Sequence, residues 1–263
     1  MKHYLNAISS LYVFTFRNIS KITLICLPII LGSIAASTSN FLATEIGFIL
    51  FALLTALYSI KAIYGTHRLY LKRDLGDYHI FKWTRSEFQF FGKTILIALI
   101  GIILTLISML ITTPLLASTL HSFSWGFLIL TTGIYFIICF CVSLFLLRYT
   151  LYFPAKAIDS YISFSESAEF MQGKLIKYTL FLFAATVPLI LMDRGVELLM
   201  SAMKFIPVLG MLVRPLYIIY TAISLSATIA IYASSLSFVY KEVLGDASKK
   251  TDDNQNAEQE FSA

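Results

Sequence analysis

Six long apolar runs constrain this chain more than any other feature. Each has about the length, roughly 20 residues, that a helix needs to cross the hydrocarbon core of a bilayer. Barrel strands would alternate apolar and polar residues, whereas these runs are apolar on every side, so helices are expected. The sequence therefore predicts an all-α, polytopic membrane protein within residues 1–245. The six predicted spans are 22–43, 46–64, 94–117, 127–147, 175–192 and 216–239.

The composition agrees with this class of protein. Hydrophobic residues make up 58% of the 263 residues and charged residues 13%, and the mean hydropathy is +0.79. A soluble globule of this size could not bury so much apolar surface. We attribute the net charge of +5 to cytoplasmic Lys and Arg that face anionic headgroups, so the lipid bilayer is the expected partner and nucleic acid is not.

Basic residues are distributed unevenly among the connecting segments. The segments before span one, between spans two and three, and between spans four and five contain Lys and Arg, whereas 41–45 and 118–126 contain neither. Because basic loops remain on the cytoplasmic side, both termini are expected to be cytoplasmic. The segment 193–214 disagrees, since it carries Arg194, Lys204 and Arg214 although the span count places it outside. The basic residues and the span count thus predict opposite sides of the membrane for this segment.

Three stretches share one apolar spacing, and each leads into a span. Apolar positions on one face and polar positions on the other are typical of helices that lie on a membrane surface. Gly92 with Lys93 and Gly173 with Lys174 mark two of the entries into spans. We therefore expect three units, each an interfacial helix followed by a helical hairpin. The shared positions are Leu5, Ile8, Tyr12, Phe16 and Ile19; Phe81, Thr84, Phe88, Phe91 and Ile95; and Tyr161, Phe164, Ala168, Met171 and Leu175.

The polar stretch after span four carries its own local signals. Pro154 lacks a backbone donor and disfavours helix at Phe153, so span four is expected to end near the interface. Ser163 and Glu166 match a capping box, and Gly173 permits a left-handed turn. The segment 161–172 is thus predicted to be a short helix lying flat at the cytoplasmic surface, and a disordered polar loop is the alternative.

Arg148 closes span four and has two interpretations. In the first, its guanidinium pairs with Asp159 or Glu166 near the interface. In the second, it anchors the end of the span to headgroups. Lys61, near the cytoplasmic end of span two, is expected to snorkel to the headgroups in the same way. The histidines, including His67, are expected to be solvated or interfacial.

Several segments resemble a known family. The pattern of Arg148, Leu151, Pro154 and Asp159 followed by SFSESAEFMQGKLIKY is similar to a segment of YciC-like bacterial inner-membrane proteins. The entry FRNISKITLICLPIIL and the ending SSLSFVYKEVLGD are also similar to that family. More distantly, the same segment resembles the membrane domain of some glycerophosphodiester phosphodiesterases. The resemblance implies an uncharacterised six-span protein of the bacterial inner membrane, and it supplies no catalytic residues.

No motif in the sequence indicates an enzyme. HExxH, GxSxG, a Gly-rich phosphate loop and paired aspartates within spans are all missing, so no catalytic residue, metal or cofactor is predicted. We favour a non-catalytic envelope or scaffold role, with transport of lipid-like or hydrophobic solutes as the alternative and an unrecognised enzyme third.

Contacts with other chains and the end of the chain are less constrained. A homo-oligomer or a membrane partner is compatible with the small residues on spans three and six, which are Gly101, Ser108, Ala222, Ser226 and Ala230. Residues 246–263 are polar and poor in aromatics, and they are expected to form a disordered cytoplasmic tail.

Overall fold

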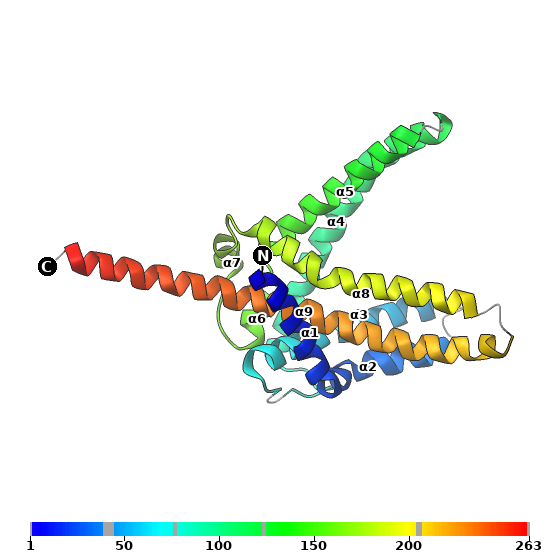
Figure 1. Ribbon diagram of the computed structural model, residues 1–263, viewed down its shortest axis with the longest axis horizontal. Helices are drawn as coiled ribbons and strands as arrows, with labels where there is room; N and C mark the ends of the chain where they lie inside the picture. Colours follow the sequence, from blue (N-terminus) through cyan, green and yellow to red (C-terminus); the bar gives the residue numbers. More distant parts are fainter. Residues whose placement is uncertain (1, 39–44, 76–77, 123–124, 204–206, 262–263) are drawn as a thin grey trace.

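The computed structural model describes residues 2–38, 45–75, 78–122, 125–203 and 207–261. All regular structure in these ranges is helical, so the all-α prediction is confirmed (Figure 1). The described residues form nine helices, which are α1 (Lys2–Arg17), α2 (Ile19–Thr38), α3 (Glu45–Lys72), α4 (Arg85–Ser122), α5 (Trp125–Leu147), α6 (Tyr152–Ala157), α7 (Phe164–Phe170), α8 (Leu175–Met203) and α9 (Pro207–Phe261).

Five of the predicted spans each fall within a different long helix, namely α3, α4, α5, α8 or α9. The first, 22–43, begins in α2, and its residues 39–43 lie outside the described part. Within the described residues, four helices are long and apolar enough to cross a membrane: they cover Ile49–Lys72, Arg85–Ile107, Leu175–Met203 and Ile219–Gly245. A fifth is added if the bent pair α1 and α2 counts as one span. The helices are therefore compatible with a multi-pass membrane protein, although the count of six spans goes beyond this finding.

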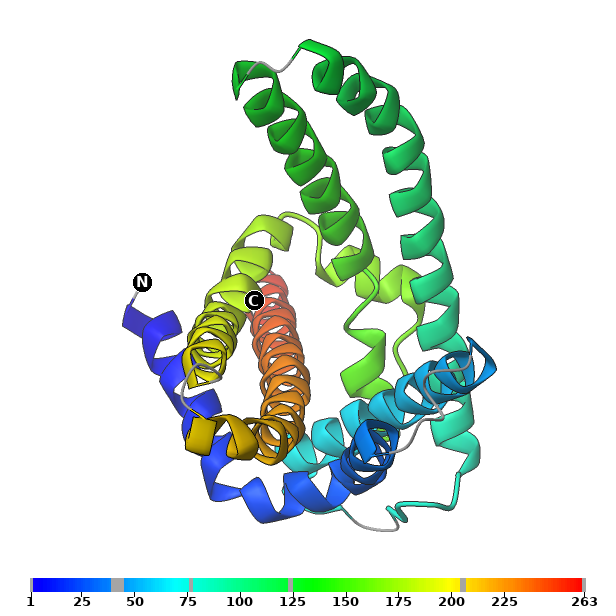
Figure 2. The ribbon, with the colours of Figure 1, turned by 90° about the vertical axis from the view of Figure 1, so that its right-hand side faces the viewer.

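Helices α2, α3, α8 and α9 form a bundle in which α9 packs against the other three (Figure 1 and Figure 2). Small side chains of α9, including Ala230, Ala233 and Ser234, are completely buried. Small residues let helix backbones approach closely, which compensates for the weak hydrophobic driving force between helices in lipid. The central position of α9 thus follows from its small residues rather than from its apolarity.

Helices α4 and α5 form a hairpin that extends away from the bundle (Figure 2). The two helices pack closely, since a Cβ atom added to Gly101 would lie 3.1 Å from Cδ1 of Leu146. Large apolar side chains on α4, such as Leu99, Ile103 and Leu106, are exposed in the chain by itself. Lipid is the natural environment for such a surface.

Helix α1 crosses the bundle instead of continuing into α2, because the two helices meet at a bend of 73° around Asn18 (Figure 1). The Tyr4 hydroxyl donates to Oε1 of Glu242 in α9 at 2.8 Å, and the Tyr12 hydroxyl donates to the Ala185 carbonyl of α8 at 2.9 Å. Helix α1 is thus a separate helix that precedes α2, and the unit of an interfacial helix followed by a helical hairpin stays a prediction.

The middle unit differs from the expectation. Helix α4 runs without a break from Arg85 to Ser122, so Gly92 and Lys93 lie inside it and mark no junction. A capping box explains the early start: Glu87 Oε2 accepts from the Thr84 N–H at 2.7 Å, and Thr84 Oγ1 accepts from the Glu87 N–H at 3.3 Å. One glycine costs a helix interior only about 1 kcal/mol, which does not end a helix that continues as an apolar run.

Two further expectations concern the ends of spans. Helix α9 continues past residue 245 to Phe261, so no helix end separates span six from the predicted tail. The side chains of residues 246–263, of Ser108 and Ala222, and of Lys204 and Arg214 lie outside the described part. So do the side chains of 41–45 and 118–126, which were expected on the outer side.

Candidate functional site

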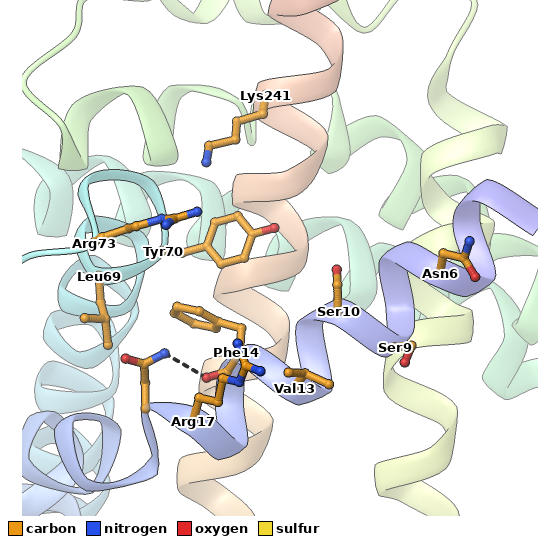
Figure 3. A pocket seen from close by; sticks show the side chains of 11 residues that line it. Asn6, Ser9, Ser10, Val13, Phe14, Arg17, Leu69, Tyr70, Arg73 and Lys241 are labelled. Carbon is orange, nitrogen blue, oxygen red and sulfur yellow. Dashed lines mark hydrogen bonds between the residues drawn. The ribbon is translucent and has the colours of Figure 1, made fainter.

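A hollow of about 720 Å³ opens where α1, the end of α3 and α9 meet (Figure 3). Its wall combines polar, aromatic and basic side chains from these three helices, which are far apart in the sequence. Its residues are Asn6, Ser9, Ser10, Val13, Phe14, Arg17 and Asn18 around α1, Leu69, Tyr70 and Arg73 around the end of α3, and Lys241 of α9. We refer to this site as the α1–α3–α9 pocket.

The pocket is strongly basic. Arg17, Arg73 and Lys241 each contribute one positive charge, and no Asp or Glu is among its lining residues. All three cations are exposed at its rim. Lys241 and Arg73 extend toward the ring of Tyr70 in Figure 3, and Nζ of Lys241 lies 5.2 Å from the centre of that ring. This cation–π contact helps to hold the ammonium group over the pocket.

The floor of the pocket is apolar and ordered by packing. The rings of Phe14 and Tyr70 meet edge to face with their centres 4.9 Å apart, and Leu69 beneath them is buried. Such an arrangement contributes about 0.5–1.5 kcal/mol beyond area burial. Phe14 thereby fastens α1 to the end of α3, which keeps Arg17 and Arg73 at the same opening.

Two local features near the ends of α1 and α3 determine where Arg17 and Arg73 lie. Asn18 Nδ2 donates to the Phe14 carbonyl at 2.9 Å at the bend after α1, which directs α1 back over α3 and α9. Arg73 follows the last residue of α3 and has a φ of 59°. A left-handed residue directly after a helix reverses the chain, so the Arg73 side chain lies at the rim rather than continuing along the helix.

The side chains that line the pocket can bind an anion. Ser9 and Ser10 carry hydroxyl groups, but no His or carboxylate lines the pocket to act as their general base. Ser10 Oγ instead donates to the Ala7 carbonyl at 2.7 Å. Three cations beside hydroxyl and amide groups are suited to an anionic group such as a phosphate.

The residues singled out in the sequence lie elsewhere, around α6 and α7. Pro154 is buried in the first turn of α6, and Phe153 is helical, so the predicted break at Phe153 is wrong. The N–H groups in the first turn of a helix have no carbonyl acceptor within the helix. Pro, which has no N–H, is therefore tolerated there. Span four nevertheless ends where expected, since α5 ends at Leu147.

The predicted capping box at the start of α7 is confirmed. Ser163 Oγ accepts from the Glu166 N–H at 3.2 Å, and Glu166 Oε2 accepts from the Ser163 N–H at 2.6 Å. This N–H holds the pKa of the Glu166 carboxyl below its ordinary value. Gly173 has the expected left-handed backbone, with a φ of 74°, and Lys174 follows it at the entry into α8.

Burial orients α7 largely as expected. Met171 is fully buried, and the half-buried Phe164 lies with its ring centre 4.7 Å from that of Tyr152. Ser167 is also buried, because its Oγ donates to the Arg148 carbonyl at 2.8 Å. This hydrogen bond was not predicted, since it joins two segments through a backbone atom.

The pairing predicted for Arg148 is not the one in the structure. Asp159 lies 3.3 Å from Nζ of Lys72 and accepts from Ser86, while Glu166 belongs to its capping box. Among the described residues, no ion pair joins Arg148 to either carboxylate. Asp159 has a φ of 61°, and the resulting turn directs it toward α3 instead.

Lys61 is a buried structural group and not a headgroup anchor. Its Nζ lies 3.0 Å from Oε1 of Glu87, donates to the Lys82 carbonyl at 2.7 Å, and lies 4.7 Å from the centre of the Trp83 ring. Both charged side chains are almost completely buried. Breaking such a pair leaves an uncompensated charge in a low dielectric, so this contact fastens α3 to the start of α4.

His67 is likewise internal and not solvated. It is fully buried in α3, and its Nδ1 lies 2.7 Å from Oγ of Ser237 in α9. Among the described residues, no group of three His, Cys, Asp or Glu side chains could hold a metal ion. The contact between His67 and Ser237 therefore joins α3 to α9.

The segment 193–214, whose basic residues disagreed with the span count, begins with a hydrogen-bonded contact between α8 and α9. Asp193 of α8 accepts hydrogen bonds from the hydroxyls of Tyr220 and Ser224 of α9. Arg194 Nη1 donates to Oε2 of Glu197 at 2.7 Å. This pair offsets one positive charge of the segment.

Comparisons with known proteins do not assign this chain to a family: no family model, curated protein or solved structure matches it.

Proposed function

We propose that this chain is a six-span protein of the bacterial inner membrane with a non-catalytic, scaffold-like role, which binds an anionic group in the α1–α3–α9 pocket at its cytoplasmic face. The observation that carries the proposal is the convergence of Arg17, Arg73 and Lys241 on one hollow without an acidic residue. Cations concentrated in this way attract anions and repel one another when the pocket is empty. An anionic occupant relieves that repulsion.

The other buried charges and polar groups support a scaffold rather than an enzyme. Lys61 is neutralised by Glu87, and His67 is hydrogen-bonded to Ser237. Both contacts join separate helices, and neither faces the pocket, so their chemistry is used within the bundle. A scaffold requires such internal links, whereas an active site requires reactive groups that a substrate can reach.

Anion binding is tested with inorganic pyrophosphate as the probe and the full-length protein in detergent. We expect pyrophosphate to raise the unfolding temperature in a saturable way, because a ligand that binds only the folded state stabilises it. The triple variant R17Q/R73Q/K241Q should lose this shift. The matched control K2Q/K82Q/R85Q removes the same charge from exposed cations outside the pocket and should keep it. Equal loss of the shift in both variants would refute the proposed site.

The six-span topology is tested with a reporter that is active only in the cytoplasm. Fusions after Lys72, Lys156 and Lys249 should give signal, and a fusion near Ser122 should not. A fusion near Met203 should also be silent, since five spans precede it and the N-terminus is cytoplasmic. Activity at Ser122 would overturn the six-span arrangement.

Transport of lipid-like or hydrophobic solutes is the alternative function. The observation that favours it is the exposed apolar edge of α1 beside the pocket, where Val13 and Phe16 are 45% and 70% exposed. Reconstituted vesicles with a fluorescent phospholipid in one leaflet would test it. Acceleration of transbilayer movement by the protein would support transport over a scaffold role.

A further inference from the structure

We infer that the occupant of the α1–α3–α9 pocket is the headgroup of a phospholipid with a net negative charge, drawn from the cytoplasmic leaflet. The phosphate lies among Arg17, Arg73 and Lys241, and the acyl chains leave along the exposed apolar edge of α1. This inference rests on the proposed function, because it identifies the ligand of the same site.

The charge of the pocket selects for a net anionic headgroup over a zwitterionic one. Three cations line it, and among the described residues no carboxylate lines it to receive the ammonium group of a zwitterionic lipid. An anionic headgroup keeps its full attraction to the cations, whereas an ammonium group would be repelled by them. Basic clusters directly cytoplasmic of a span are typical of anionic lipid binding.

The size of the pocket indicates a headgroup rather than a single phosphate ion. A hollow of about 720 Å³ lies in the range of small-molecule sites, far above what one phosphate fills. Asn6, Ser9 and Ser10 lie along α1, away from Arg73 and Lys241 in Figure 3. These side chains can hydrogen-bond headgroup hydroxyls while the cations hold the phosphate.

The position of the pocket lets a lipid enter without leaving its leaflet. Arg73 directly follows Lys72, the last residue of a helix apolar enough to cross a membrane, and Lys241 lies near the end of the apolar part of α9. The rim is therefore at the level of the headgroups.

The edge of α1 supplies an exit for the acyl chains. Leu5, Val13 and Phe16 are 58%, 45% and 70% exposed, and Val13 also lines the pocket. Helix α1 is held against α8 and α9 by Tyr12 and Tyr4, so this apolar edge keeps its position. A soluble phosphate compound would gain nothing from the edge, whereas a lipid buries it.

Binding of short-chain lipids to the delipidated full-length protein tests the inference. The probes are dihexanoyl phosphatidylglycerol, dihexanoyl phosphatidylethanolamine and inorganic pyrophosphate, and the readouts are calorimetric affinity and unfolding temperature. We expect phosphatidylglycerol to bind at least tenfold more tightly than either other probe. R17Q/R73Q/K241Q should weaken phosphatidylglycerol binding about a hundredfold, because each cation near a membrane surface contributes about fivefold in affinity. The control K2Q/K82Q/R85Q should change this affinity less than twofold.

A second variant separates lipid from free phosphate. Val13→Ser leaves every cation in place and removes part of the apolar edge, so it should weaken phosphatidylglycerol binding several-fold and leave pyrophosphate binding unchanged. The unfolding temperatures of the unliganded variants are measured first, so that affinities are compared only between folded proteins.

The outcomes distinguish this inference from the proposed function. If pyrophosphate binds as tightly as phosphatidylglycerol, or if phosphatidylethanolamine does, the lipid inference is overturned and the anion site stands. If no probe binds, or if the control triple variant loses as much affinity as the pocket triple variant, both are overturned.

Discussion

The bundle and the α4–α5 hairpin are both built from long apolar helices, yet they are stabilised differently. In the stretch Ile219–Gly245 of α9, 65% of the most apolar 18 residues is buried. In the stretch Arg85–Ile107 of α4, the corresponding share is 6%. Burial of α9 depends on small residues such as Ala233, whereas α4 presents Leu and Ile to its surroundings. The comparison teaches that hydropathy identifies a span but does not tell whether protein or lipid will cover it.

The largest effect is expected where the bundle and the hairpin are joined. Lys61→Met leaves the Glu87 carboxylate buried without its partner and should destabilise the protein by about 3–5 kcal/mol. Thermal unfolding in detergent measures this loss. The double variant K61M/E87M should recover most of it, because no isolated charge remains. An unchanged unfolding temperature for Lys61→Met would show that the pair does not couple the two regions.

A smaller loss of stability is expected from added volume in the bundle, and almost none from the same change on the hairpin. Ala233→Leu adds volume to a completely buried position on α9 and should destabilise the bundle by about 1–3 kcal/mol. Ala98→Leu makes the same change at an exposed position on α4 and should alter the unfolding temperature little. Equal effects of the two substitutions would contradict the difference in packing.

The smallest effect concerns α7, which contacts both regions. Phe164 of α7 lies with its ring centre 5.1 Å from Nζ of Lys93 in the hairpin, and α7 also packs against α9. The pKa of Glu166 is lowered in the folded state by the Ser163 N–H. Its carboxylate therefore stabilises the fold above the unfolded value of 4.5, and this contribution disappears as the pH falls through the lower folded value.

Unfolding temperatures of the parent and of Glu166→Gln across the acidic range measure this contribution. The parent should be the more stable of the two at neutral pH, and the difference should shrink as the carboxylate is protonated. A difference that stays constant with pH would mean that the charge of Glu166 plays no part in the cap.

Most of the local structure could be predicted from the sequence. The six apolar runs each correspond to one long helix, and Ser163, Glu166 and Gly173 act where their spacing placed them. The capping box at Thr84 and Glu87 has the same spacing and could have been found in the same way. That signal would have moved the start of α4 to Arg85 and removed the junction expected at Gly92.

The candidate site could be predicted only in part. Arg17 and Arg73 belong to basic segments that were predicted to be cytoplasmic, and Lys241 lies in the C-terminal part, but the convergence of the three side chains was not foreseen. This convergence depends on the bend after α1 and on the left-handed backbone of Arg73. A glycine would have indicated such a turn in the sequence, but neither position is a glycine. Asp159 shows the same difficulty, since its partner Lys72 lies far away in the chain.

The helical class, the positions of the apolar runs and the short-range caps and turns all follow from the amino-acid sequence without knowledge of the assembled helices. These properties depend on the transfer of each segment into an apolar medium and on hydrogen bonds between residues a few positions apart. The tertiary structure alone decided that Lys61 is buried against Glu87, that α9 rather than α4 is enclosed, and that three distant cations share one pocket. Coulomb interactions and packing act through distance in space, and that distance exists only once the helices have assembled.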